Sequence, residues 1–202
     1  EAGNKSEVAK QSFKKTSTAT DADLIPTITL AGTEVAGKPT LYQGTVTATI
    51  TAPAINADTQ NPLDRLEYQF VEAGSTINDT NWKTCRDGDV LSYSNTTGTL
   101  YARAVDIAGK TTLAAKYAQS AFIADSRVPV VSITAPAGVS ESNWTAGPVT
   151  LKVEGGTKDR DGNTVVSGVK KIEYKIDSGN WFDLPADGTL EVNTTGKQTI
   201  TV

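Results

Sequence analysis

An internal repeat with a period close to one hundred residues constrains this chain more than any other feature. Runs of similar residues recur in the same order, and each second run follows the first by 98 to 106 residues. The matched runs are Asp23–Pro26 with Asp125–Pro129, Leu66–Phe70 with Ile172–Ile176, Asn81–Trp82 with Asn180–Trp181, and Asn95–Gly98 with Asn193–Gly196. One β-sandwich has about 100 residues, so the repeat predicts two homologous sandwiches whose loops differ in length.

Alternation of polar and apolar residues indicates strands within each repeat. Val46–Ala52 has apolar residues at even positions and threonine at odd positions, and Val149–Val153 repeats the pattern. Such a strand buries one face and exposes the other. Turns are predicted where aspartate precedes glycine, as at Asp87-Gly88 and Asp187-Gly188. We expect the one stretch with helical character, Thr111–Phe122, to be a long final strand, so the chain is predicted to be all-β.

The two ends of the chain resemble complementary parts of one domain. Ala2–Lys10 is similar to Ala108–Lys116, which leads into the final strand of the first repeat. At the other end, Gln198–Val202 corresponds to only the first part of Leu100–Asp106. The piece that the second repeat lacks is therefore the piece that precedes the first repeat.

These similarities predict three segments. Residues 1–23 are the final strand of a preceding or neighbouring domain plus a linker, residues 24–125 form the first domain, and residues 126–202 form a second domain without its final strand. Two explanations remain open. Either the chain is part of a longer array, or the N-terminal strand of one copy completes the second domain of another copy by strand addition.

Composition argues against several classes of protein. The chain has no histidine, no methionine, one cysteine and a net charge of −4. Nucleic-acid binding needs clustered basic residues, so no nucleic-acid partner is expected. We expect neither a signal peptide nor a membrane span among these residues. Cys85 has no partner for an internal disulfide, and we expect it to be a small buried apolar residue.

Several motifs resemble bacterial immunoglobulin-like repeats of large cell-surface and adhesin proteins. They are Tyr101–Lys110, Ser167–Val169, Ile172–Tyr174 and the linkers from aspartate to proline. The resemblance implies tandem immunoglobulin-like (Greek-key) β-sandwiches that serve as a stalk at an extracellular surface or in a cell wall. The family's loop ends in Ala-Gly-Asn, which Asn4 keeps and Lys110 does not. From its position, Asp106 is expected to accept hydrogen bonds from backbone N–H groups of this turn.

No catalytic residue is assigned, because nucleophile–histidine arrangements require the histidine that this chain lacks. Asp159–Asn163 resembles the start of a calcium loop, but Lys170 stands where an EF-hand has its glutamate. We therefore interpret Asp159–Asn163 as an acidic turn. Asp106 with Asp125 is a second arrangement that could ligate calcium. No metal or cofactor is assigned, and ligand-binding residues remain unknown.

Three tryptophans are the candidates for a sugar-binding platform: Trp82, Trp144 and Trp181. Trp82 and Trp181 occupy matching positions in the two repeats, and Trp144 aligns with Leu41. Recurrence at matching positions is typical of residues that pack in the fold, so we expect packing roles for all three.

The favoured function is therefore a non-catalytic stalk module that spaces an adhesive head from the cell, with neighbouring immunoglobulin-like domains as its partners. Two alternatives stay open: a filament subunit that polymerises by N-terminal strand donation, and an adhesin or carbohydrate-binding module with a host or glycan ligand. A covalent Lys–Asn cross-link within a domain is a further option.

Overall fold

A computed structural model describes residue 11 and residues 24–55 and 61–202 of the chain. Strands dominate these residues, which contain no α-helix, so the all-β prediction is confirmed. The strands are β1 (Thr27–Glu34), β2 (Leu41–Thr51), β3 (Leu63–Glu72), β4 (Lys83–Cys85), β5 (Asp89–Tyr93), β6 (Thr96–Asp106), β7 (Ala118–Asp125), β8 (Val131–Thr134), β9 (Val149–Gly155), β10 (Glu173–Ile176), β11 (Phe182–Asp183), β12 (Thr189–Val192) and β13 (Ile200–Thr201). The predicted final strand within residues 1–23 lies outside the described residues, apart from exposed Gln11.

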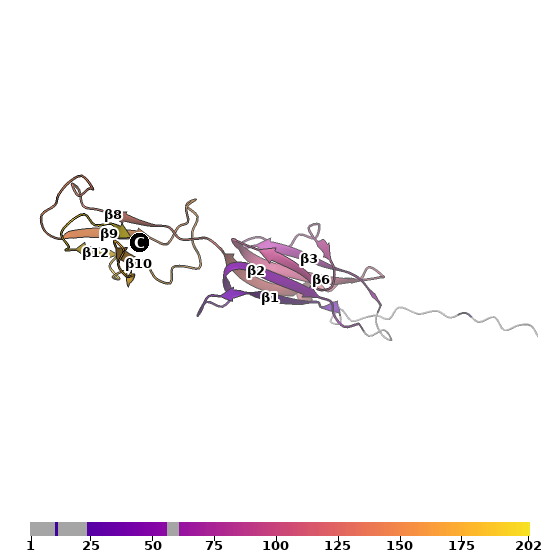
Figure 1. Cartoon of the computed structure of the whole chain (residues 1–202). Coiled ribbons are helices and arrows are strands. Elements are labelled where there is room, and N and C mark those ends of the chain that lie inside the picture. Colours follow the sequence, from indigo (N-terminus) through magenta and orange to yellow (C-terminus); the bar gives the residue numbers. More distant parts are fainter. Residues whose placement is uncertain (1–10, 12–23, 56–60) are drawn as a thin grey trace, which may run out of the picture. The chain divides into compact units, whose positions relative to one another are not determined.

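The strands form three sheets (Figure 1). The seven-stranded sheet has the order β1-β2-β7-β6-β3-β4, with β5 also paired to β2. The two three-stranded sheets have the orders β12-β9-β8 and β11-β10-β13. β7 therefore pairs with β2 on one side and with β6 on the other. It joins β1, β2 and β5 to β6, β3 and β4 in one sheet.

Two compact units share these strands. Of the described residues, the first unit contains 11, 24–31, 47–55, 61–91 and 98–121, and the second contains 32–46, 92–97 and 122–202. The seven-stranded sheet contributes residues to both units. The predicted domain limits, 24–125 and 126–202, stay predictions.

The core of the first unit forms from the alternation seen in the sequence. Ile50 of β2 and Leu66 of β3 are fully buried and pack with Leu24, Ala102 and Ala104. Ala48 precedes Ile50 on the same face of β2 and is equally buried, and so is Val46, which belongs to the second unit. Side chains of a strand alternate between its faces, so this period of two places every second residue in the core.

The predicted long strand Thr111–Phe122 is wrong in its first half. Thr111 forms one isolated bridge with Val105, residues Ala114–Lys116 form a 3-10 turn (η2), and β7 begins only at Ala118. Local hydrogen bonding explains the break. The hydroxyl of Thr112 donates to the carbonyl of Leu24, and the N–H of Ala104 donates to that hydroxyl, which anchors the chain before it turns.

The second unit contains the parallel pairing of β2 with β7, in which Leu41 lies opposite Ile123 and Gln43 lies opposite Asp125. Leu151 of β9 and Leu190 and Val192 of β12 form a small core, against which Tyr174 of β10 and Ile200 of β13 pack. Leu151 and Val153 are buried as the alternation of β9 predicts.

The repeated sequence runs have the same strand register. Tyr68 of β3 lies opposite Lys83, the residue after Trp82. Tyr174 of β10 lies opposite Phe182, the residue after Trp181. On the other side of these strands, Phe70 lies opposite Leu100 of β6, and Ile176 lies opposite Ile200 of β13. The neighbours of β3 are thus matched by the neighbours of β10.

Candidate functional site

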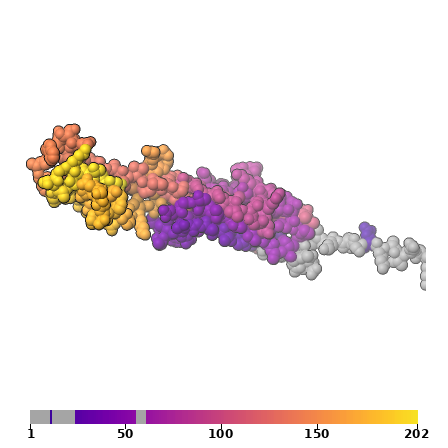
Figure 2. Space-filling model, in the orientation of Figure 1, coloured from indigo at the N-terminus to yellow at the C-terminus, as the bar shows by residue number. Residues whose placement is uncertain are grey.

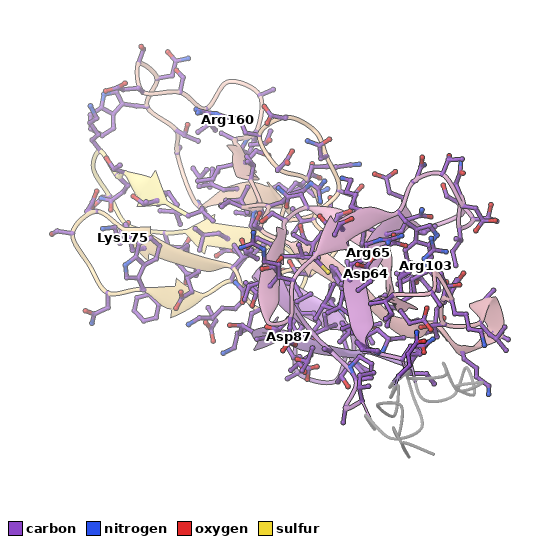
Figure 3. All side chains as sticks on the ribbon, turned by 90° about the vertical axis from the view of Figure 1, so that its right-hand side faces the viewer. Asp64, Arg65, Asp87, Arg103, Arg160 and Lys175 are labelled. Carbon is purple, nitrogen blue, oxygen red and sulfur yellow. The ribbon has the colours of Figure 1, made fainter. Side chains whose placement is uncertain are left out.

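A buried ion pair lies on the outer face of the sheet formed by β3 and β6. The carboxylate of Glu67 accepts 2.7 Å hydrogen bonds from Nε of Arg65 and Nε of Arg103. Burial by itself raises the pKa of Glu67, but the two guanidinium groups outweigh it and hold the pKa below its ordinary value. Figure 3 shows Asp64, Arg65 and Arg103, of which Asp64 forms an exposed ion pair with Arg65. Glu67 is therefore ionised and held in place, which suits a structural role.

Trp82 has the packing role that was predicted for it, and it packs against this ion pair. The guanidinium carbon of Arg103 lies 4.2 Å from the centre of the Trp82 ring, and the ring of Tyr117 contacts Trp82 edge-on at 5.0 Å. The indole N–H of Trp82 is buried and has no hydrogen-bond partner within the described residues. Sequence reasoning missed this ion pair, although Glu67 recurs as Glu173 in the second repeat.

The packing predicted for the other tryptophans is only partly found. Trp144 is 89% exposed, so its predicted packing role is wrong. Leu41, with which Trp144 aligns, is buried where β2 pairs with β7. Half of Trp181 is exposed, with Nζ of Lys175 5.1 Å from the centre of its ring. The tryptophans therefore differ in environment although two of them match in register.

Asp106 stabilises the turn after β6, as predicted. Its Oδ1 accepts hydrogen bonds from the N–H groups of Ala108 and Lys110, and its Oδ2 accepts one from the amide of Asn61. Burial alone would raise the pKa of Asp106. The hydrogen-bond donors lower it by more, so the pKa lies below its ordinary value. Because the donors engage both oxygens, the carboxylate acts as a buried turn anchor.

Asp125 anchors a different part of the chain. Its buried carboxylate accepts a 2.6 Å hydrogen bond from the N–H of Ser167 and contacts both the N–H and the guanidinium of Arg127. Burial alone raises the pKa of Asp125, but the backbone donors, foremost Ser167, keep it below its ordinary value. Asp106 and Asp125 thus each have their own hydrogen-bond donors.

The residues Asp159–Asn163 form a turn. Oδ1 of Asp159 accepts hydrogen bonds from the N–H groups of Asp161 and Asn163, and Arg127 lies 3.7 Å from Oδ2. The hydrogen bonds hold the pKa of Asp159 below its ordinary value, although burial acts in the opposite direction. This is the geometry of an aspartate that stabilises its own turn, which is the interpretation that the sequence favoured.

Cys85 is buried, as predicted, at the position opposite Leu66 in the pairing of β3 with β4. Burial, aided by the negative charges of Asp89 and Glu67, raises the pKa of its thiol to about 11. The thiolate is the reactive form, so this thiol is unreactive near neutral pH.

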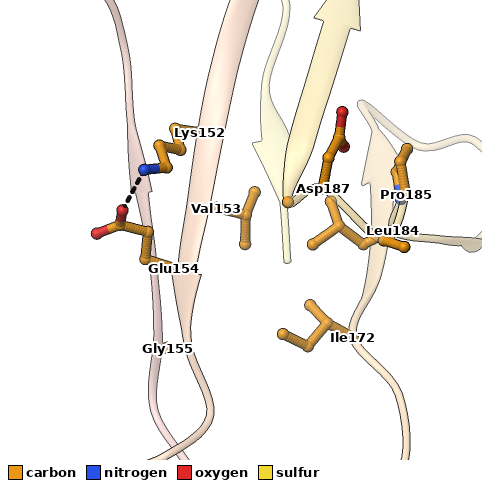
Figure 4. A pocket seen from close by; sticks show the side chains of 10 residues that line it. Lys152, Val153, Glu154, Gly155, Ile172, Leu184, Pro185 and Asp187 are labelled. Atoms are coloured by element: carbon orange, nitrogen blue, oxygen red, sulfur yellow. Dashed lines mark ion pairs between the residues drawn. The ribbon is translucent and has the colours of Figure 1, made fainter.

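A solvent-open hollow of about 480 Å³ lies between the two three-stranded sheets (Figure 4). Val153, Ile172 and Leu184 form its apolar side, and Lys152 forms an exposed ion pair with Glu154 at its edge. Asp187 also lines the hollow and accepts the N–H of Thr189. Lys152 and Glu154 at the hollow thus bind each other, and Asp187 binds the backbone.

Metal-binding clusters and membrane-spanning helices are both absent from the described part of the chain. Within residues 24–55 and 61–202, no three carboxylate or cysteine side chains gather as they do around a metal ion. No helix in these same ranges has the length and hydropathy that crossing a membrane requires. The buried polar side chains described above hold turns and strands in place.

Neither the models of known protein families nor the curated proteins contain a match to this chain.

Proposed function

We propose that this chain is a non-catalytic structural module of a repetitive extracellular surface protein. In this proposal the chain folds as tandem immunoglobulin-like Greek-key sandwiches and holds an adhesive head away from the cell. Its partners are neighbouring sandwiches of the same kind. The family resemblance of the sequence motifs supports the extracellular location.

One observation carries the proposal: the second half of the chain repeats the strand neighbours of the first half. β1, β2 and β5 are neighbours in the first half, and β8, β9 and β12 are neighbours in the second. The set β6-β3-β4 is likewise matched by β13-β10-β11. Repeated units that contact mainly their neighbours build rods whose length is set by the number of repeats.

Buried carboxylates support a role that needs a stiff chain. Asp125 holds the N–H of Ser167, and Val130 exchanges backbone hydrogen bonds with Lys158 and Gly156. Arg127 lies between Asp125 and Asp159, 3.4 Å from the first carboxylate and 3.7 Å from the second. The segment that follows β7 is therefore attached at several points, which limits its bending.

The parallel pairing of β2 with β7 suits a chain under tension. Residues 41–43 lie opposite residues 123–125, and the N–H of Ile123 donates to the carbonyl of Thr40. A force along two parallel strands loads their hydrogen bonds together rather than one after another. Such a pairing resists extension better than a hairpin that opens from one end.

The test is to stretch the single chain between two handles attached to its ends. A spacer should unfold in two cooperative steps, each releasing roughly 25–35 nm of chain, because an extended chain spans about 3.3–3.6 Å per residue. Ile123→Pro should lower the force of one step, since proline removes the N–H that donates to the carbonyl of Thr40. Gradual extension without steps would contradict the proposal.

A carbohydrate-binding module is the second candidate, and the exposure of Trp144 favours it. An indole that is 89% exposed offers a flat apolar surface of the kind on which sugar rings stack. A glycan array decides between the two functions. Binding that Trp144→Ala abolishes would favour the module, whereas the stalk proposal expects no glycan to bind.

A further inference from the structure

A short hairpin in the second unit carries an aspartate followed by a glycine. The hairpin consists of residues 158–164, and the N–H of Gly162 donates to the carbonyl of Asp159 across its turn. Asp161 and Gly162 are both exposed at the tip. Figure 2 shows the residues around position 160 (orange) at the surface. The peptide bond between Asp161 and Gly162 is therefore open to solvent.

The side chain of Asp161 has no partner that holds it in place. Within the described residues its carboxylate accepts no hydrogen bond and forms no ion pair, because the N–H donors of the turn bind Asp159 instead. Gly162 has a positive φ of 83°, and a Cβ placed on it would have no atom within 4 Å. Glycine also leaves its own nitrogen accessible, since it has no side chain. The carboxyl carbon of Asp161 and the nitrogen of Gly162 are thus free to approach each other.

The aspartate–glycine pair at positions 87 and 88 is held by the fold. Oδ1 of Asp87 accepts a 2.7 Å hydrogen bond from the N–H of Ala52. The N–H of Gly88 donates to the carbonyl of Ile50 at 2.9 Å. Both the carboxylate and the glycine nitrogen of this pair are therefore bound to backbone groups near the end of β2.

The pair at positions 187 and 188 is the closest match to the pair in the hairpin, because its glycine N–H also donates across a turn. Here the carboxylate is bound. Oδ1 of Asp187 accepts the N–H of Thr189, which holds the pKa of Asp187 below its ordinary value. The glycine is packed as well: the carbonyl of Gly188 accepts the N–H of Val153, and a Cβ on Gly188 would lie 2.9 Å from the carbonyl oxygen of Val153. The two turns thus differ in the freedom of their aspartate and glycine.

We propose that Asp161-Gly162 is a site of spontaneous modification, at which the aspartate becomes isoaspartate through a succinimide. The amide nitrogen of Gly162 bonds to Cγ of Asp161, and one carboxyl oxygen leaves as water with the carboxyl proton and the amide proton. Water then opens the ring at one of its two carbonyl carbons. Opening at the backbone carbon of Asp161 leaves the chain linked through Cβ, whereas opening at Cγ restores aspartate. One water is lost and one is gained, so the mass of the chain is unchanged.

Isoaspartate lengthens the backbone of the hairpin by one carbon atom, which loosens the contacts that the turn makes. The N–H of Asn163 donates to Oδ1 of Asp159 at 2.7 Å, across the position that becomes longer. The same hairpin contacts the segment after β7, because the N–H of Val130 donates to the carbonyl of Lys158 and Arg127 lies 3.7 Å from Asp159. The inference goes beyond the spacing role and does not rest on it, since the reacting groups belong to one turn.

Ageing the full chain in solution tests the proposal. The protein is kept at neutral pH and body temperature for several weeks, and isoaspartate at the three aspartate–glycine pairs is measured by peptide mapping with electron-transfer fragmentation. Asp161 should convert at least about threefold faster than Asp87 and Asp187, a factor that one net hydrogen bond provides. In water enriched in the heavy oxygen isotope, each conversion should add one heavy oxygen atom to the peptide.

Two comparisons separate the effect of the fold from that of the local sequence. In urea the three pairs lose the contacts that distinguish them, so their rates of conversion should become similar. Asp161→Glu keeps the charge of the turn but disfavours ring closure, and it should abolish isoaspartate at this position. Amide hydrogen exchange at Asn163 should be faster in the aged natural chain than in the equally aged Asp161→Glu variant, because only the natural chain acquires the longer turn.

Equal rates at Asp161 and Asp187 in the folded chain, or no isoaspartate at position 161, would overturn the proposal. So would the same order of rates in urea, since the local sequence rather than the fold would then set the order. Equal hydrogen exchange at Asn163 in the two aged proteins would overturn the loosening of the hairpin. The spacing role is tested separately, because its two cooperative unfolding steps are measured on freshly prepared chain.

Discussion

Tyr68 and Tyr174 occupy equivalent positions in their sheets. Each lies opposite the residue that follows a tryptophan, Lys83 in one case and Phe182 in the other. Each tyrosine also packs against the buried core of its own unit. A shift of one residue in a strand would turn its side chains to the other face. The shared register is therefore a structural counterpart of the sequence repeat.

The ion pair of Glu67 with Arg103 should contribute measurably to stability. Glu67→Gln removes the charge between two guanidinium groups and should lower the free energy of unfolding by about 2 kcal/mol. Urea titration followed by circular dichroism measures the change. The matched control is Glu173→Gln, which breaks the exposed pair with Lys171 and should have little effect. If the two substitutions lowered the free energy of unfolding equally, burial of Glu67 would not explain the contribution of its ion pair.

Stability should fall in acid because of the buried aspartates. The folded-state pKa of Asp106 lies below its ordinary value of 3.8. Such a group contributes stability above the unfolded-state pKa, and this contribution is lost as the pH falls through the folded-state pKa. Urea titrations from pH 7 down to pH 2 should therefore show the loss below about pH 4. Asp106→Asn should flatten the pH dependence, whereas Asp79→Asn in an exposed loop should not.

The thiol of Cys85 should resist alkylation in the folded protein. Burial keeps the side chain from reagents and raises the pKa of the thiol to about 11, so little thiolate is present at pH 8. Iodoacetamide labelling followed by intact mass should be slow in buffer and complete within minutes in urea. Rapid labelling of the folded chain would show that the β3–β4 edge opens.

Gly98 should not tolerate a side chain. A methyl group at Gly98 would lie 2.3 Å from the carbonyl oxygen of Val71 and 2.6 Å from the ring of Phe70. Backbone on one side and the ring of Phe70 on the other leave no room, so Gly98→Ala should cost about 2 kcal/mol or more. Thr99→Ala, at the next position of β6, is the control and should cost far less. Comparable unfolding midpoints would show that the sheet relaxes around the methyl group.

Local patterns predicted the parts of the fold that depend on local chemistry. The alternation in Val46–Ala52 indicated which face of β2 is buried, and the position of Asp106 indicated that it anchors a turn. Contacts between distant segments were not predictable in this way. The pairing of Glu67 with Arg103 depends on the register of β3 with β6, which no single segment contains.

The exposure of Trp144 has a similar explanation. Alignment with Leu41 predicted packing, but Leu41 is buried where it lies opposite Ile123 of β7, which is 82 residues further along the chain. The break at Ala114–Lys116 was missed because it depends on the hydrogen bonds of Thr112 with Leu24 and Ala104. In both cases the deciding partner is distant in sequence.

Cross-strand NOEs in a ¹³C,¹⁵N-labelled sample test the duplicated architecture most directly. The account predicts backbone NOEs between Tyr174 and Phe182 and between Lys175 and Thr201, matching those between Tyr68 and Lys83 and between Gln69 and Tyr101. A register in the second half that is shifted by one residue, or a different strand beside Tyr174, would contradict it.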